Sequence, residues 1–386
     1  MSGQERKFDT KLIHFGSEID ETTGASSVPI YQASTFHHHD IFNPPVHDYS
    51  RSGNPTRQAL EDYIAVLEGG VRGFAFSTGM SAISTTFMLL SAGDHIIVTE
   101  DVYGGTYRLL TTILSRMKIE TTFVDMTDLE AVKSALQPNT KAVYIETPSN
   151  PTLKITDIAA VAGWAKAQGL ISIVDNTFMT PYYQRPLELG VDIVLHSATK
   201  FLGGHSDVLA GLAVAGSEEL AKQLKYLQNG MGTVLGAHES WLLMRGMKTL
   251  GARMAHSEIS ARKLAGWLSR RNDIGAVYYP GLPEHPGREV QEKQSTGYGA
   301  VVSFDVGSGE RAKQVLSDVK LPLVAVSLGA VESILSYPAM MSHASMPAEV
   351  RAERGITDGL LRFSVGLEDI DDLIQDLEQA LENSPK

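Results

Sequence analysis

The sequence predicts an α/β fold with a mostly parallel sheet and a smaller α/β domain at its C-terminal end. Between residues 73 and 215, short β-rich runs alternate with helical patterns, which is typical of βαβ units. Several of the runs are apolar on both faces, as strands covered by helices on both sides of a sheet require. The chain has 386 residues, more than one typical domain, so we expect two packed domains.

The elements of the first sheet follow one another in a regular order. The predicted strands cover residues 73–77, 95–99, 121–125, 142–146, 171–175, 192–196 and 209–214. The main helices predicted between them cover residues 79–91, 106–117 and 155–168. This alternation of strand and helix is what predicts the parallel sheet.

A long helical stretch at 234–271 is predicted to lead into the second domain. There, strands at 299–306 and 360–365 flank a helix at 310–319. An amphipathic helix at 371–382 is expected to close the chain.

Residues 1–60 mix His, Pro, Gly and Asn with little periodicity. So long an irregular segment is unusual inside a compact domain, and we interpret it as an extended arm that contacts a neighbouring subunit. The expected division is therefore an arm at 1–60, a first α/β domain at 61–255 and a C-terminal domain at 256–386.

Composition excludes several classes of function. Lys and Arg total 33 against 45 Asp and Glu, and this net charge of −12 argues against a surface for nucleic acid or anionic lipid. The chain has no cysteine, so disulfides, thiolate metal sites and a cysteine nucleophile are excluded. No apolar stretch approaches the roughly 18 residues of a membrane span, and the first residues lack the apolar core of a signal peptide, which predicts a cytoplasmic protein.

No metal site is expected. The run His37, His38, His39 and Asp40 has no companion ligands at metal spacing. Three adjacent histidines cannot all face one ion.

Polar residues directly after the predicted strands are the candidates for a ligand site, because open α/β sheets bind ligands beyond the carboxyl ends of their strands. Asp175 ends one apolar run, and a carboxylate there can pair with a protonated pyridine nitrogen. Taken alone, a helix cap is the commoner role of such an aspartate. After the next run, the Ser197 and Thr199 hydroxyls can hold a phosphate while Lys200 forms a Schiff base, although a lone strand-end lysine is more often a surface residue.

Two further strand ends agree with this interpretation. At Gly79 a strand passes into a helix, and the free N–H groups of a helix N-terminus bind phosphate. Tyr103 follows another strand, where its ring can stack on a flat heterocycle. Each signal is modest by itself, but together they fit one planar, phosphorylated cofactor.

The chain resembles the Cys/Met-metabolism family of pyridoxal-5'-phosphate (PLP) enzymes from about Thr10 to Leu381. The family includes cystathionine β-lyases, cystathionine γ-lyases, cystathionine γ-synthases and methionine γ-lyases. The resemblance is carried by residues 49–57 (YSRSGNPTR), 103–106 (YGGT), 146–151 (ETPSNP), 175–177 (DNT), 196–200 (HSATK), 327–333 (SLGAVES) and 361–366 (LRFSVG). It implies the type I fold of PLP-dependent transferases, which is similar to aspartate aminotransferase, with PLP bound by the domain at 61–255.

The resemblance also implies a role for each matching residue. Lys200 is the Schiff-base lysine and a catalytic base, and Tyr103 is a ring-stacking residue that protonates the departing sulfur. The residues implied to bind the cofactor are Tyr49, Arg51, Gly79, Met80, Tyr103, Asp175, Ser197, Thr199 and Lys200. The residues implied to bind substrate are Asn150, Ser327, Glu332 and Arg362.

In this family Tyr49 and Arg51 reach the phosphate of the neighbouring subunit. A dimer is then the smallest competent unit, and a homotetramer built as a dimer of dimers is expected.

Within the family the sequence is most similar to bacterial cystathionine β-lyases, which implies cleavage of L-cystathionine to homocysteine, pyruvate and ammonia in methionine biosynthesis. Glu332 stands where γ-type members carry a glutamate, so cystathionine γ-lyase, cystathionine γ-synthase or O-acylhomoserine thiolyase, and methionine γ-lyase remain alternatives.

Two other classes fit less well. An NAD-dependent dehydrogenase would need a G-x-G-x-x-G turn after a strand, which this sequence lacks, and gives Lys200 no role. A catalytically inactive PLP-fold binding protein would be expected to have lost Lys200 or Asp175.

Overall fold

Two sheets organise the computed structural model, which describes residues 6–14, 19–344 and 346–384. The larger has seven strands in the order β1-β7-β6-β5-β4-β2-β3. They are β1 (Arg72–Phe76), β2 (His95–Thr99), β3 (Glu120–Val124), β4 (Thr140–Glu146), β5 (Ile171–Asp175), β6 (Ile193–Ser197) and β7 (Gly211–Ala215). Only β7 runs antiparallel to its neighbours, so the predicted mostly parallel sheet is confirmed.

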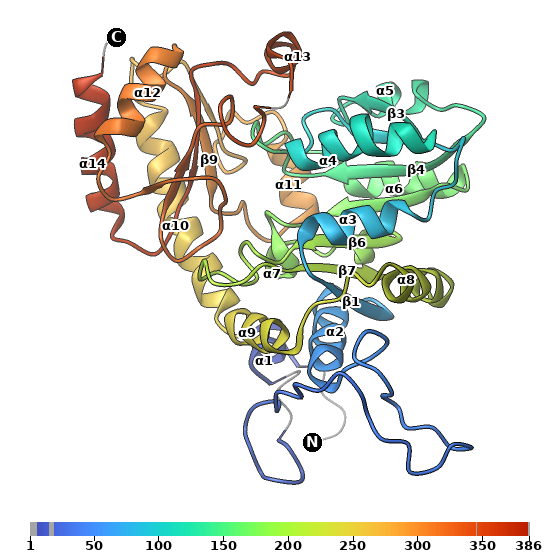
Figure 1. Cartoon of the computed structure of the whole chain (residues 1–386). Coiled ribbons are helices and arrows are strands. Elements are labelled where there is room, and N and C mark those ends of the chain that lie inside the picture. Colours follow the sequence, from blue (N-terminus) through green and yellow to red (C-terminus); the bar gives the residue numbers. More distant parts are fainter. Residues whose placement is uncertain (1–5, 15–18, 345, 385–386) are drawn as a thin grey trace.

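Helices cover both faces of this sheet (Figure 1). They are α2 (Pro55–Glu68), α3 (Gly79–Phe87), α4 (Gly104–Arg108), α5 (Leu129–Ser134), α6 (Ile158–Ala167), α7 (Thr180–Tyr183) and α8 (Glu218–Met231). In β2, Ile96 and Val98 belong to one buried cluster and Ile97 to another. Because alternate strand residues face opposite sides, each face of the sheet has its own apolar core.

The predicted helical stretch at 234–271 is two helices. α9 (Ala237–Met247) ends at Lys248, and α10 (Leu250–Leu268) begins after Thr249. α10 then runs from the larger sheet to the smaller one (Figure 1). Helix α8 was not predicted, although Ser217 caps its N-terminus through a side-chain hydrogen bond.

The second sheet has five strands in the order β10-β11-β12-β9-β8. They are β8 (Ala276–Tyr278), β9 (Val301–Asp305), β10 (Leu323–Val324), β11 (Ile334–Ser336) and β12 (Leu360–Ser364). Its helices are α11 (Arg288–Gln294), α12 (Gly309–Asp318), α13 (Ala348–Glu353) and α14 (Ile370–Asn383). Both predicted strands and both predicted helices of this region are confirmed. β8, β10 and β11 are too short to show a hydrophobic period.

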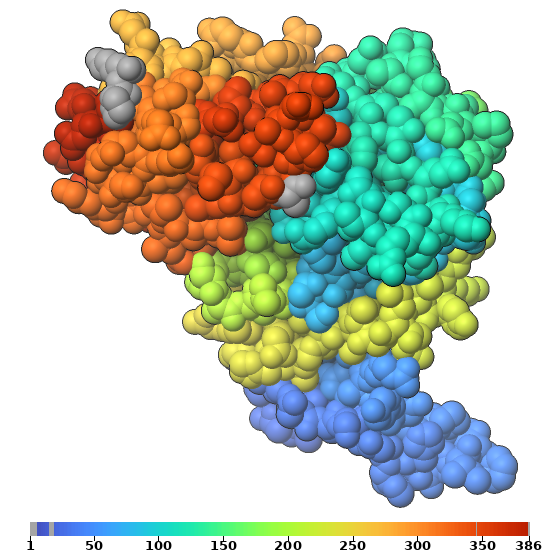
Figure 2. Space-filling model, turned by 45° about the horizontal axis from the view of Figure 1, so that its top comes forward, coloured from blue at the N-terminus to red at the C-terminus, as the bar shows by residue number. Residues whose placement is uncertain are grey.

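The N-terminal segment projects away from the rest of the chain (Figure 2). It contains α1 (Phe8–His14), and α2 begins inside it at Pro55, so the segment is not irregular throughout. Three large apolar side chains on it are strongly exposed, Ile41 by 76%, Phe42 by 86% and Val46 by 95%. In the part of the chain that the structure describes, no helix is long and apolar enough to cross a membrane.

An ion pair between the buried Arg311 and the partly buried Asp273 fixes the second sheet to its helices. Arg311, at the start of α12, lies 2.5 Å from the Asp273 carboxylate and also donates to Ser384 after α14. Arg271 contacts the other oxygen of the same carboxylate at 2.9 Å. The hydrogen bonds and charges of these two arginines lower the pKa of Asp273 to about 2.

Asp273→Asn should lower the free energy of unfolding at pH 7 by about 1–3 kcal/mol, because it removes a charged acceptor from the buried Arg311. Since the folded pKa lies below the ordinary value of 3.8, this stabilisation is complete above about pH 4 and is lost as the pH falls towards 2. Urea unfolding of both proteins from pH 7 to pH 2 measures the difference, which should shrink only in that acid window. Glu310→Gln, which breaks an exposed pair with Lys313 on the same helix, is the matched control and should change stability by about 0–1 kcal/mol.

Candidate active site

A cavity of about 360 Å³ lies at the carboxyl ends of β4, β5 and β6 and is closed by residues of the C-terminal region, including Arg362 of β12. Most of the residues predicted for the site meet there. Those that line it are Gly79, Met80, Tyr103, Asn150, Asp175, Ser197, Thr199, Lys200, Ser327 and Arg362.

Lys200 lies in the turn after β6, where its backbone N–H donates to Ser197 O at 3.2 Å. Its Nζ donates to the Ser327 hydroxyl at 2.6 Å. Burial, with a contribution from the nearby Arg362 charge, lowers the pKa of Lys200 to about 8. Near neutral pH much more of this amine is therefore uncharged and nucleophilic than of an ordinary lysine.

Asp175 ends β5 and is buried. One carboxylate oxygen accepts from the Thr177 N–H at 3.0 Å and from its hydroxyl at 2.5 Å, and the other accepts from the Tyr144 hydroxyl at 3.2 Å. Burial raises the pKa of Asp175 despite these hydrogen bonds. A cation placed against this carboxylate would oppose that shift and hold it ionised.

The start of α3, which packs against the end of β6, allows close backbone approach. Gly79 begins α3, and a Cβ at this position would lie 2.8 Å from Ser197 Cβ, so only glycine fits. The Thr199 hydroxyl is held by hydrogen bonds to Ala210, the residue before β7, and accepts from its N–H at 3.0 Å. This helix N-terminus with two hydroxyl residues is a suitable cradle for a phosphate.

Tyr103 is 39% exposed at the cavity, and its ring lies over Gly105, where a Cβ would be 2.4 Å from the ring. Its backbone N–H donates to the Glu146 carboxylate at 3.0 Å. Glu146 also lines the cavity and pairs with Asp175 in the register of β4 and β5. Burial, then the neighbouring Asp175, raise the pKa of Glu146 well above its ordinary value.

Arg362 comes from β12 and is buried. It donates to Asn150 Oδ1 at 2.7 Å and to Ser327 O at 2.8 Å. Its Nε has no hydrogen-bond partner among the described residues. A guanidinium held on two sides with donors left over is suited to bind a carboxylate bidentately.

Three predicted residues do not line this cavity. Glu332 instead accepts a hydrogen bond from the Ser206 hydroxyl. Tyr49 and Arg51 belong to the arm, where the Arg51 guanidinium lies 5.6 Å from the Tyr49 ring. None of the described arm residues lines the cavity.

Several contributing residues were not predicted, among them Tyr144 and Thr177, which hold Asp175, and three charged residues. Glu146 ends a predicted strand as Asp175 does, so the same rule could have found it. Arg108 lines the cavity from α4, but a charged residue on a short helix carries no such signal. Arg253 of α10 donates to Phe201 O at 2.6 Å and so fixes the loop after Lys200, a contact that only the tertiary structure creates.

Comparison with known proteins agrees with this geometry. The family model described as Cys/Met metabolism PLP-dependent enzyme matches residues 9–382. The chain belongs to this family. It is 60% identical over 381 residues to cystathionine beta-lyase MetC of Bacillus subtilis, covering 99% of this chain and 98% of the relative. It is 55% identical to cystathionine gamma-lyase of the same organism over 377 residues, covering 98% of this chain and all of that relative.

A solved structure gives the same result for the fold. Cystathionine gamma-lyase from Lactobacillus plantarum, complexed with L-serine, superposes with a TM-score of 0.96 at 50% identity and covers 98% of this chain and 99% of that one. The type I PLP fold expected from the sequence is therefore confirmed, and the chain is a PLP-dependent enzyme.

The cavity fits PLP. A buried carboxylate with a raised pKa is available to a pyridinium nitrogen, a helix N-terminus to the phosphate and an amine to the aldehyde. Among residues 6–14, 19–344 and 346–384, no cluster of three or more histidine or acidic side chains is arranged to hold a metal ion.

The Lys200 amine of the cofactor-free protein should become reactive with a midpoint near pH 8, because burial and Arg362 disfavour its charged form. An ordinary lysine has its midpoint near 10.4. Competitive labelling with acetic anhydride across pH 6–11, read by mass spectrometry of the Lys200 peptide, measures it. Arg362→Gln should move the midpoint upward, and a midpoint above 10 in the unsubstituted protein would contradict the effect of burial.

Proposed function

We propose that this enzyme cleaves the Cβ–S bond of L-cystathionine to give homocysteine, pyruvate and ammonia, as a step of methionine biosynthesis. The observation that carries the proposal is the 60% identity, over 99% of the chain, to a relative named cystathionine beta-lyase. The cavity supports it, because Arg362 can bind an amino-acid carboxylate beside the Lys200 amine.

The geometry supports the roles that the family resemblance implies for the cofactor-binding residues. When bound, PLP supplies an electron-withdrawing ring that stabilises negative charge at the substrate Cα. Asp175 would pair with the ring nitrogen and keep it protonated. Gly79, Met80, Ser197 and Thr199 would hold the phosphate, and Tyr103 would stack on the ring.

Substrate orientation is assigned to the second sheet. Arg362 would bind the α-carboxylate through its free N–H groups, and Asn150 and the Ser327 backbone hold Arg362 in place. A carboxylate bound there would fix the direction of the substrate Cα–H bond relative to Lys200.

Proton transfer is assigned to two side chains. Lys200, with a pKa of about 8, can remove the proton at Cα near neutral pH. Tyr103 lies at the open side of the cavity and would donate a proton to the departing sulfur.

The arm supports an active site that is shared between two copies of the chain. Tyr49 and Arg51 do not line the cavity of their own chain, and the arm exposes Ile41, Phe42 and Val46. We infer a homo-oligomer, at least a dimer and by family resemblance a dimer of dimers, in which Tyr49 and Arg51 bind the phosphate in a second copy.

The domain boundaries at residues 60 and 255 stay predictions, which the two separate sheets support. The cytoplasmic location also stays a prediction.

A γ-type reaction is the second candidate, because relatives named cystathionine gamma-lyase are 55% and 50% identical to this chain. Glu332 would then take part in substrate choice. Its hydrogen bond to Ser206 is the contact that fixes it.

The identity of the 2-oxo acid released from L-cystathionine distinguishes these reactions. The PLP-loaded enzyme should give pyruvate and homocysteine, measured by mass spectrometry. Lys200→Ala should lower turnover by about 10²–10⁴-fold or more, because the base at Cα is lost. Lys222→Ala, at an exposed position on α8, is the control and should be unaffected. Release of 2-oxobutyrate and cysteine would replace the β-lyase with a γ-lyase.

A further inference from the structure

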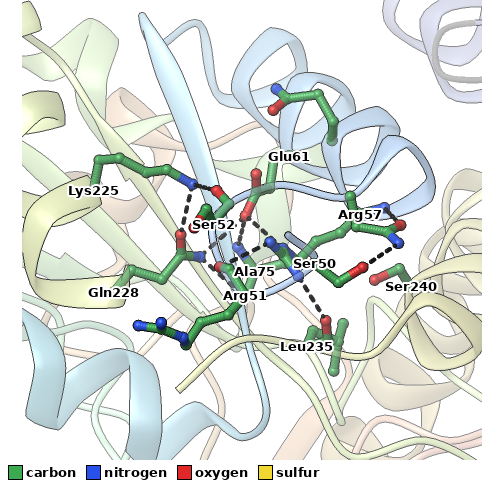
Figure 3. A network of polar contacts seen from close by, with 12 residues as sticks. Ser50, Arg51, Ser52, Arg57, Glu61, Ala75, Lys225, Gln228, Leu235 and Ser240 are labelled. Atoms are coloured by element: carbon green, nitrogen blue, oxygen red, sulfur yellow. Dashed lines mark hydrogen bonds and ion pairs between the residues drawn. The ribbon is translucent and has the colours of Figure 1, made fainter. Parts of the chain in front are cut away.

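The arm residues Arg51 and Ser52 are held by a buried polar cluster of their own chain (Figure 3). The inference drawn from it rests on the proposed role of Arg51 at the phosphate of a second copy. We define the anchor cluster as Arg57, Glu61, Lys225 and Gln228.

Arg57 is the central cation of the anchor cluster and is only 2% exposed. It donates to Arg51 O at 3.3 Å and to Leu235 O at 3.3 Å. Its Nε lies 3.5 Å from the Glu61 carboxylate, one turn along α2. One buried guanidinium therefore connects the backbone of the arm to the segment before α9.

Lys225 holds the next residue of the arm, because its Nζ donates to Ser52 O. The Arg51 side chain in turn donates to Asn229 O at 2.9 Å. The consecutive carbonyl groups of Arg51 and Ser52 thus each accept a hydrogen bond from a charged side chain, Arg57 of α2 or Lys225 of α8. This arrangement fixes the direction in which the Arg51 side chain leaves the backbone.

Glu61 and Gln228 connect the same cluster to the larger sheet. One Glu61 oxygen accepts from Ala75 N and from Gln228 Nε2, both at 3.0 Å. Gln228 also donates to Ala75 O at 3.1 Å. Ala75 lies in β1, which leads within four residues to Gly79 of the phosphate cradle.

We propose that the anchor cluster is a positioning unit, built on the Arg57–Glu61 pair, which presents Arg51 to the cofactor phosphate of a second copy of this chain. None of its four residues lines the Lys200 cavity, so their effect on the cofactor passes through the arm. Loss of the Glu61 charge leaves Arg57 without its buried counter-charge and loosens the backbone of Arg51.

Glu61→Gln and Arg57→Met should each raise the PLP dissociation constant by about tenfold or more, the effect of one lost charged hydrogen bond. Cofactor absorbance during titration of the apo-oligomer measures it. Asp62→Asn removes the adjacent, exposed charge of the same helix and should leave the constant within about twofold. Equal constants for Glu61→Gln and Asp62→Asn would overturn the proposal.

Hybrid oligomers separate positioning from misfolding. A Glu61→Gln chain and a Lys200→Ala chain are co-expressed with different tags and purified together. One site then combines an intact Lys200 with an intact arm from the other chain, and it should retain PLP through gel filtration as tightly as a hybrid of unsubstituted and Lys200→Ala chains. A misfolded Glu61→Gln chain could not contribute such a site.

An Arg51→Ala chain in the same hybrids distinguishes failure of the anchor-cluster proposal from failure of the proposed shared site. If the hybrid restores PLP retention for the Arg51→Ala chain but not for the Glu61→Gln chain, the anchor cluster acts inside its own subunit and the proposal is overturned. If Arg51→Ala alone binds PLP as tightly as the unsubstituted chain, the shared arm of the proposed function is what fails.

Discussion

The active site depends on hydrogen bonds that join the two sheets. Arg362 of β12 reaches Asn150 after β4, and Lys200 after β6 reaches Ser327 of the C-terminal region. These contacts hold the Arg362 guanidinium and the Lys200 amine at fixed positions on the two sides of one cavity. The position of the second sheet therefore decides where a substrate carboxylate can lie relative to Lys200.

Two acids and two bases, Asp175, Glu146, Lys200 and Arg362, line the same small cavity, and their charges interact. Burial raises the pKa of Asp175 and Glu146 and lowers the pKa of Lys200 and Arg362, the last to about 10. Every group is thus shifted towards its neutral form. A cofactor with a cationic ring nitrogen beside Asp175 and a phosphate at Gly79 would place compensating charge in this cavity, so the arrangement fits such a molecule.

The sequence predicted the strand ends well because each buried strand is an apolar run that stops at a polar residue. Asp175 and Lys200 lie where that rule places them. Arg362 is different: only the family resemblance assigned it, since an arginine in a strand is usually exposed. Arg253 was beyond reach because its contact with Phe201 is set by long-range packing. Glu332 was assigned by the resemblance, but its contact with Ser206 depends on the same kind of packing.

The central claim is that Lys200 holds the cofactor, and chemical trapping tests it most directly. The PLP-loaded protein is reduced with borohydride, digested and mapped by mass spectrometry. A single pyridoxyl group on the peptide that contains Lys200 is the predicted result. A pyridoxyl group on another lysine, with Lys200 unmodified, would contradict the assignment of this cavity as the active site.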